Sequence, residues 1–173
     1  MKIKIRIKAT VTDLALAEKY KSTLRGGYFT AENGEKLPLE KLSSECDEVI
    51  EYTVFGEYHE DGNKITITYN EPEDIGFDCT TALIFDKTDR SVLTMARTGE
   101  LSSAFRFDLN ERRQLCGYET PFMPVEFTVN TKRMANKVSE KGGGILIDYC
   151  IEVRGVNTER NVMLIEVRPY DAE

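Results

Sequence analysis

The sequence predicts an all-β protein that folds as a closed or nearly closed antiparallel up-and-down β-barrel of about 8–10 strands. Three observations carry this prediction. Apolar and polar side chains alternate along many segments, turn-forming residues separate these segments at intervals of about 8–12 residues, and no helical periodicity appears from Asp47 onward. A single sheet of so many short strands favours closure, because closure removes the exposed edges.

The length and charge of the chain narrow the classes of function. Its 173 residues are the size of one domain, and we expect a single domain over residues 1–173. The net charge of −7 argues against nucleic-acid binding, which depends mainly on basic side chains that neutralise phosphates. No apolar run approaches the roughly 20 residues that a membrane helix needs, so we expect no membrane partner.

The first predicted strand, residues 2–11, shows the alternation most clearly. Its apolar face holds Ile3, Ile5, Ile7, Ala9 and Val11, and its basic face holds Lys2, Lys4, Arg6 and Lys8. Because successive side chains of a strand point to opposite sides, this segment has one dry and one wet face. The segment lacks the continuous apolar stretch of a signal peptide, and we expect a cytoplasmic protein.

The four cysteines indicate free thiols. Cys46, Cys79, Cys116 and Cys150 are scattered, and no Cys-x-x-Cys pair occurs. In a reducing compartment such residues act as small, partly buried apolar side chains. We therefore expect neither a metal site nor a cofactor.

The same alternation recurs along most of the remaining chain. It covers residues 50–58, 65–70, 93–97, 101–107, 115–119, 125–129 and 145–153. Residues 160–168 alternate less clearly, as a strand covered on both faces does. Between these segments, turn signals include Asp61-Gly62 and the three glycines at 142–144.

Residues 12–46 depart from this pattern. Leu14, Ala17, Tyr20 and Leu24 follow helical spacing, and Gly26-Gly27 is a suitable end for a short helix. Residues 31–44 are predicted to be a loop. We expect this insertion to cover one barrel end, either as a plug over apolar side chains or as a ligand lid. The plug is favoured, because a covering role requires no ligand.

Polar residues on predicted apolar faces are the most informative feature. By alternation, Glu71 follows Tyr69 inward, Arg97 follows Met95, Ser103 lies between Leu101 and Phe105, and Glu119 follows Leu115 and Gly117. A buried ionic group must be paired, so we expect Arg97 to meet Glu71, Glu119 or both. Neighbouring hydroxyl groups could share the acceptors, from Ser102, Ser103, Thr80, Thr81 or Tyr118. Two interpretations stay open: a structural network that fixes strand register, or the polar floor or rim of a binding pocket.

Catalysis has weaker support. Glu71 and Glu119 could act as an acid–base pair, but the sequence gives no separation between them. The single histidine, His59, falls on the predicted outer face, which argues against a Ser-His-acid triad. We therefore expect no enzymatic activity, while the Glu71–Glu119 pair stays as the less favoured alternative.

Several ordered motifs carry a resemblance to a known family. They are Tyr69-x-Glu71, Thr80-Thr81, Arg97-Thr98-Gly99-Glu100-Leu101-Ser102-Ser103, Tyr118-Glu119-Thr120-Pro121-Phe122, and Gly143-Gly144 followed by Ile147-Asp148-Tyr149. Over residues 45–168 the chain resembles the YwiB-like family, bacterial domains of unknown function. This resemblance implies a small cytoplasmic barrel of the calycin, lipocalin-like type, without implying an activity. The chain differs from that pattern in its long 12–46 stretch and in Met123, where a glycine is common.

Two functions follow as expectations. The first is a barrel that binds a small apolar or amphiphilic ligand, with binding residues Glu71, Arg97, Ser103, Glu119, Tyr69 and Tyr118. The second is a structural or interaction protein with a filled core. In that case the basic face of residues 2–8 would guard a sheet edge, or dock an acidic partner or a second copy in a homodimer.

Overall fold

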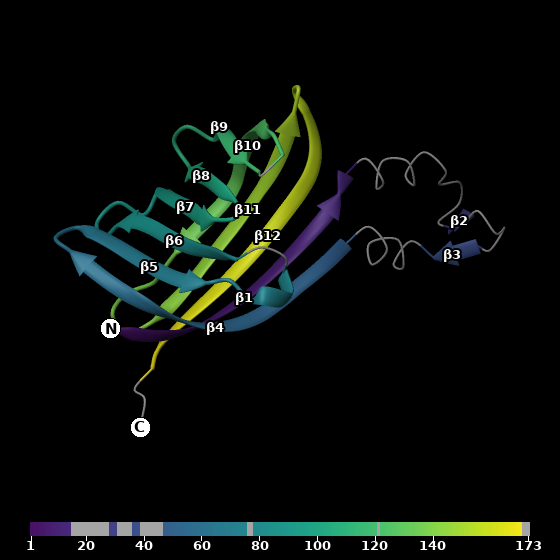
Figure 1. Ribbon diagram of the computed structural model, residues 1–173. Helices are drawn as coiled ribbons and strands as arrows, with labels where there is room; N and C mark the ends of the chain where they lie inside the picture. The colour runs from purple at the N-terminus through teal and green to yellow at the C-terminus, as the bar shows by residue number, and fades with distance from the viewer. Residues whose placement is uncertain (15–27, 31–35, 39–46, 76–77, 121, 171–173) are drawn as a thin grey trace.

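The computed structural model describes residues 1–14, 28–30, 36–38, 47–75, 78–120 and 122–170. Within them, ten antiparallel strands form one closed barrel (Figure 1). The barrel strands are β1 (Lys2–Asp13), β4 (Asp47–Asp61), β5 (Lys64–Asn70), β6 (Cys79–Asp86), β7 (Val92–Gly99), β8 (Ser102–Asp108), β9 (Arg113–Glu119), β10 (Pro124–Asn136), β11 (Gly143–Val153) and β12 (Val156–Pro169). The predicted all-β fold class and the closed barrel are confirmed.

The strands are joined almost entirely in chain order. From β4 to β12 each strand pairs with the next one along the chain, and β1 closes the barrel between β12 and β4. Ile7 of β1 lies opposite Ile165 on one side and Tyr52 on the other. The basic face of β1 therefore guards no sheet edge, so this part of the interaction hypothesis is wrong.

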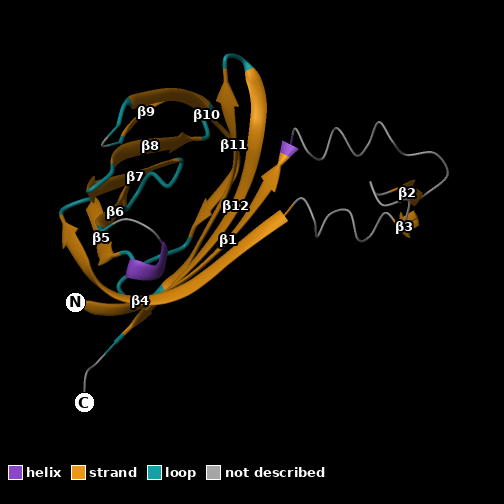
Figure 2. Cartoon of the chain, turned by 45° about the vertical axis from the view of Figure 1, so that its right-hand side comes forward, coloured by secondary structure: helices purple, strands orange, loops and turns teal. Residues whose placement is uncertain are grey.

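The insertion between β1 and β4 is described in part. Strands β2 (Tyr28–Thr30) and β3 (Lys36–Pro38) pair as a separate two-stranded sheet. Three-residue strands are too short to show alternation, which is why the sequence predicted a loop over 36–38. The predicted helix over 14–24 lies almost wholly outside the described residues, as do the plug and lid roles, and all of these stay predictions. Elsewhere in the described chain, a 3₁₀ turn, η1 (Glu73–Ile75), is the helical element between β5 and β6 (Figure 2).

The core fills the end of the barrel where β4 turns into β5 and continues toward the middle of the barrel. Large aliphatic and aromatic side chains pack there with less than a tenth of their surface exposed, including Ile3, Ile65, Phe85, Leu93 and Phe107. Val138, in the connection between β10 and β11, also belongs to this cluster. The alternation predicted for these strands thus directs their apolar faces inward.

Gly56 lies at a sharp contact in the wall. It is opposite Ile3 in β1 and Tyr69 in β5, where the long strand β4 passes from one neighbour to the other. A Cβ atom on Gly56 would lie 2.3 Å from the Thr68 carbonyl oxygen and 3.1 Å from the Tyr69 Cβ. Only glycine allows this approach of two backbones, which brings Tyr69 close to β4.

Replacing Gly56 by alanine should destabilise the protein by about 2 kcal/mol or more, because backbone atoms must move to admit the methyl group. Gly117 is the matched control: it is also in a strand, and a Cβ there would meet nothing within 4 Å. Gly117→Ala should be neutral or stabilising by up to about 1 kcal/mol. Urea denaturation of both variants measures the difference, and equal effects would contradict the close contact at Gly56.

Candidate functional site

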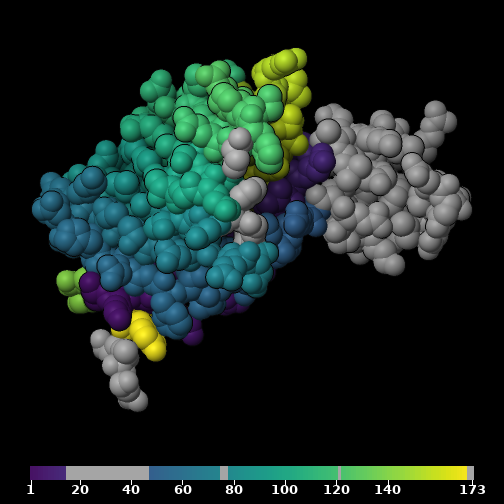
Figure 3. Space-filling view, in the orientation of Figure 1, coloured from purple at the N-terminus to yellow at the C-terminus, as the bar shows by residue number. Residues whose placement is uncertain are grey.

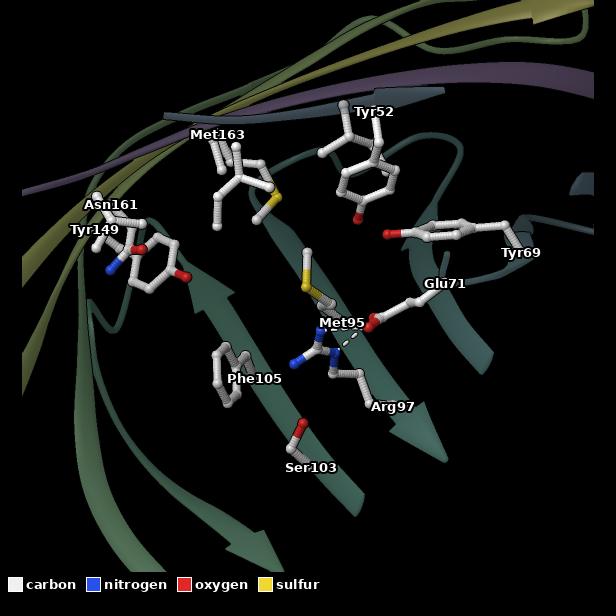
Figure 4. A pocket seen from close by; sticks show the side chains of 14 residues that line it. Tyr52, Tyr69, Glu71, Met95, Arg97, Ser103, Phe105, Tyr149, Asn161 and Met163 are labelled. Carbon is white, nitrogen blue, oxygen red and sulfur yellow. Dashed lines mark hydrogen bonds and ion pairs between the residues drawn. The ribbon is translucent and has the colours of Figure 1, made fainter. Parts of the chain in front are cut away.

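A cavity of about 200 Å³ lies inside the barrel, away from the turn between β4 and β5, and core residues such as Ile7, Met95 and Tyr149 form part of its wall. Apolar side chains from five strands form most of its wall, among them Ile7, Ile50, Met95, Phe105 and Met163. Polar side chains also face it, among them Tyr52, Tyr69, Glu71, Arg97, Ser103 and Tyr149 (Figure 4). In the space-filling view, β1 atoms lie in a recess between those of β4 and β10 (Figure 3). A few convergent polar groups in an apolar cavity are typical of small-molecule sites.

Strand register places five polar residues side by side. Tyr69 of β5 is opposite Thr81 of β6, which is opposite Arg97 of β7. Arg97 is opposite Ser103 of β8, which is opposite Tyr118 of β9. We call these five residues the polar rung. Directly opposed residues on one face of a sheet have neighbouring side chains, so the rung forms a continuous polar band across five strands.

An ion pair between Arg97 and Glu71 anchors this band. Arg97 Nε donates to Glu71 Oε1 at 2.6 Å, and Nη2 donates to Oε2 at 2.5 Å. The Thr81 hydroxyl donates to Glu71 Oε1 at 2.5 Å. Glu71 follows β5, and its backbone N–H donates to the Cys79 carbonyl at 2.9 Å, which extends the pairing with β6 by one step. The carboxylate is therefore fixed by three side-chain hydrogen bonds, as a buried charge requires.

Arg97 is charged and largely enclosed. Its side chain is 27% exposed, and that of Glu71 is 6% exposed. Burial alone would lower the pKa of the guanidinium, but its hydrogen bonds to Glu71 and the negative charge there raise it above the ordinary value. The remaining terminal nitrogen, Nη1, donates to the Tyr118 hydroxyl at 3.1 Å.

The tyrosines of the cavity stay protonated. Burial raises the pKa of Tyr69 well above its ordinary value, and burial also raises the pKa values of Tyr52 and Tyr149. The hydroxyls of Tyr52 and Tyr69 hydrogen-bond to each other. Figure 4 shows the Tyr52, Tyr69 and Tyr149 hydroxyls directed toward the cavity. They therefore present neutral hydrogen-bonding groups to anything bound there.

Ser103 differs from the rest of the polar rung. Ser103 is 8% exposed, and its hydroxyl has no hydrogen-bond partner in the described part of the chain. Its two neighbours in the rung, Arg97 and Tyr118, bond to each other instead. Figure 4 shows the hydroxyl pointing toward the cavity. Because a buried hydroxyl without a partner costs free energy, this group needs an explanation.

The structure brings together five of the six residues that the sequence selected: Tyr69, Glu71, Arg97, Ser103 and Tyr118. The predicted contact between Arg97 and Glu71 forms. Their role in ligand binding stays a prediction.

The inward orientation predicted for Glu119 is wrong. In β9 the buried side chain is Cys116, at 3% exposed, whereas Leu115 is 73% exposed and Glu119 faces outward with it. The apolar Leu115 suggested the opposite register, but Tyr118 and Glu119 are adjacent and cannot both point inward. Glu119 is thus absent from the cavity, and the acid–base pair with Glu71 does not form.

Sequence reasoning missed Tyr52, Tyr149 and Asn161 as cavity residues. The two tyrosines were on predicted inner faces, but their rings were interpreted as part of the apolar core. The available signal was the phenol oxygen, since a buried tyrosine hydroxyl usually requires a polar neighbour.

Other candidate chemistry is limited in the described ranges. Cys79, Cys116 and Cys150 are free and buried there, in agreement with the sequence prediction, while Cys46 lies outside these ranges. His59 faces outward as predicted. Among the residues with described positions, no three His, Cys, Asp or Glu side chains gather as a metal site would require, and none of the helical segments could cross a membrane.

Replacing Arg97 by alanine should destabilise the protein by about 3 kcal/mol, because Glu71 would be left as a buried, unpaired carboxylate. The double variant Arg97→Ala/Glu71→Gln should recover a substantial part of this loss, since the remaining amide carries no charge. A double-mutant cycle by denaturant unfolding measures the coupling. A loss below about 1 kcal/mol for Arg97→Ala, as in exposed pairs, would show that the pair is solvated.

Comparison with known proteins supports the fold. The crystal structure of the ywiB protein from Bacillus subtilis matches with a TM-score of 0.67 and 19% sequence identity, covering 98% of this chain and 92% of that one. No curated protein matches the chain. A family model described as a domain of unknown function, DUF1934, matches residues 40–165. That match covers most of the sequence and agrees with the resemblance carried by the motifs, so the chain belongs to the DUF1934 family.

Proposed function

We propose that this barrel is a non-catalytic binding protein for a small amphiphilic molecule, held in the cavity beside Arg97 and Ser103. The observation that carries the proposal is the buried Ser103 hydroxyl, which has no hydrogen-bond partner among the described residues and points toward the cavity. A ligand with a hydrogen-bonding group at this position would satisfy it. Buried polar groups without partners are uncommon in native proteins and call for a physical reason, which a bound ligand would supply at this position.

The size of the cavity limits the ligand. An apolar cavity of about 150 Å³ is sufficient to hold benzene. The cavity of about 200 Å³ therefore suits one ring, or a short chain of similar volume, with one small substituent. The ring would contact Met95, Phe105 and Met163, and the substituent would reach Ser103. A long acyl chain, as bound by larger barrels, exceeds this volume.

The state of Glu71 supports binding over catalysis. Its carboxylate accepts hydrogen bonds from Arg97 at both oxygens and a further one from Thr81. A general base must be able to accept a proton from the substrate, whereas both oxygens of this carboxylate already accept hydrogen bonds from residues of the barrel wall.

A screen by thermal shift and native mass spectrometry tests the proposal. Small mono-substituted rings and short amphiphiles should raise the melting temperature and form one-to-one complexes, because a ligand that binds only the folded state stabilises it. Long-chain fatty acids are the size control and should give neither effect. Binding of the long chains, or no binder among the small compounds, would contradict the proposal.

Ser103→Ala should leave the ligand-free protein as stable as the wild type or slightly more stable, because within the described part of the chain the hydroxyl has no hydrogen bond to lose. The same variant should weaken binding of the compounds that the screen identifies. Thr81→Val is the matched control in the polar rung: it removes a hydroxyl that does donate to Glu71 and should cost about 1–3 kcal/mol. Urea unfolding and titration calorimetry measure the two effects. A clear loss of stability in Ser103→Ala would show that its hydroxyl is already satisfied without a ligand.

A further inference from the structure

The charge balance of the cavity determines which kind of ligand it can accept. Of the described residues that line it, Glu71 and Arg97 carry the ionised side chains. They neutralise each other in a two-point ion pair, and Nη1 of Arg97 is directed to Tyr118. The pair therefore presents no uncompensated charge to a ligand.

An anionic ligand would meet unfavourable surroundings. Three of the five N–H groups of Arg97 donate to Glu71 and Tyr118, and its positive charge is balanced by the adjacent Glu71 carboxylate. An anion would therefore lose its hydration without gaining an uncompensated positive charge. The Glu71 carboxylate, which lines the cavity, would also repel an anion placed beside it.

A cationic ligand would also be disfavoured. It would share a cavity of about 200 Å³ with the Arg97 guanidinium. Both oxygens of Glu71 already accept hydrogen bonds from Arg97, whose positive charge balances the carboxylate. The cation would lose its hydration without gaining a carboxylate partner.

The hydroxyl groups of the cavity can serve an uncharged ligand. Ser103 can donate and accept, and the Tyr149 hydroxyl is directed toward the cavity on the opposite side from Glu71 (Figure 4). Burial raises the pKa of Tyr149, so its phenol stays neutral. Such groups pair with carbonyl, amide or hydroxyl groups of a ligand at little electrostatic cost.

We infer that the cavity selects an uncharged, ring-sized molecule with one hydrogen-bonding substituent at Ser103, and rejects anions and cations of the same shape. This inference rests on the proposed binding function and adds the charge class of the ligand. Selectivity of this type arises because the wrong ligand leaves charges unpaired, while the correct one completes the existing hydrogen bonds.

Three compounds of nearly identical shape test the inference: benzamide, which is neutral, benzoate, which is an anion, and benzamidine, which is a cation at neutral pH. Toluene serves as the apolar reference. Titration followed by ligand-observed NMR and calorimetry should show benzamide binding at least about tenfold more tightly than either ion. Ser103→Ala should reduce the affinity for benzamide several-fold and leave that for toluene unchanged.

Ser102→Ala is the matched control, because Ser102 is the neighbouring serine of β8 and lies opposite Glu119, which faces outward. It should leave all four affinities unchanged. Benzoate or benzamidine binding as tightly as benzamide would overturn the inference while the binding function stands. If none of the four compounds bound to the folded protein, both the inference and the proposed function would be contradicted.

Discussion

The ion pair between Glu71 and Arg97 is the interaction on which the interior of this barrel depends. Two charges in an enclosed space are tolerable only when every strong donor and acceptor has a partner. Thr81 donates a hydrogen bond to Glu71, and Tyr118 accepts one from Arg97. Strand register makes both possible, because it places Thr81 directly opposite Arg97 and Tyr118 directly opposite Ser103, the other neighbour of Arg97. A slip of one residue in any of the strands β5 to β9 would turn part of this network toward solvent, so the network and the register stabilise each other.

The two ends of the barrel have different contents, and this difference creates the cavity. Large side chains such as Phe85, Phe107 and Leu93 fill the end where β4 turns into β5, and Val138 packs against them. Toward the other end, the small residues Ala9 and Ser103 stand among larger ones in the wall, and the ion pair holds the long Arg97 side chain against Glu71. An interior that fills one end and leaves space at the other provides rigidity and a defined site in the same domain.

Sequence reasoning identified most of this site by a single test: a polar residue that alternation places on an apolar face. The test succeeded for Glu71, Arg97 and Ser103, because their strands alternate without interruption. It failed for Glu119, because Leu115 is apolar although it is exposed. The pattern of β9 alone therefore points to the wrong face, and only the pairing with neighbouring strands determines which face is buried. It also passed over Tyr149, since a tyrosine ring fits an apolar pattern and the hydroxyl becomes informative only when its neighbours are known.

The sequence by itself determined that the chain is all-β, that it closes, and that certain charged residues turn inward, because these properties follow from local alternation and turn chemistry. The tertiary structure decided which of these residues meet. Arg97 pairs with Glu71 and not with Glu119, and Ser103 lies between Arg97 and Tyr118, which are hydrogen-bonded to each other. Both outcomes depend on register between strands far apart in the chain, and on how much volume their side chains leave unfilled. Neither quantity is encoded in any single segment.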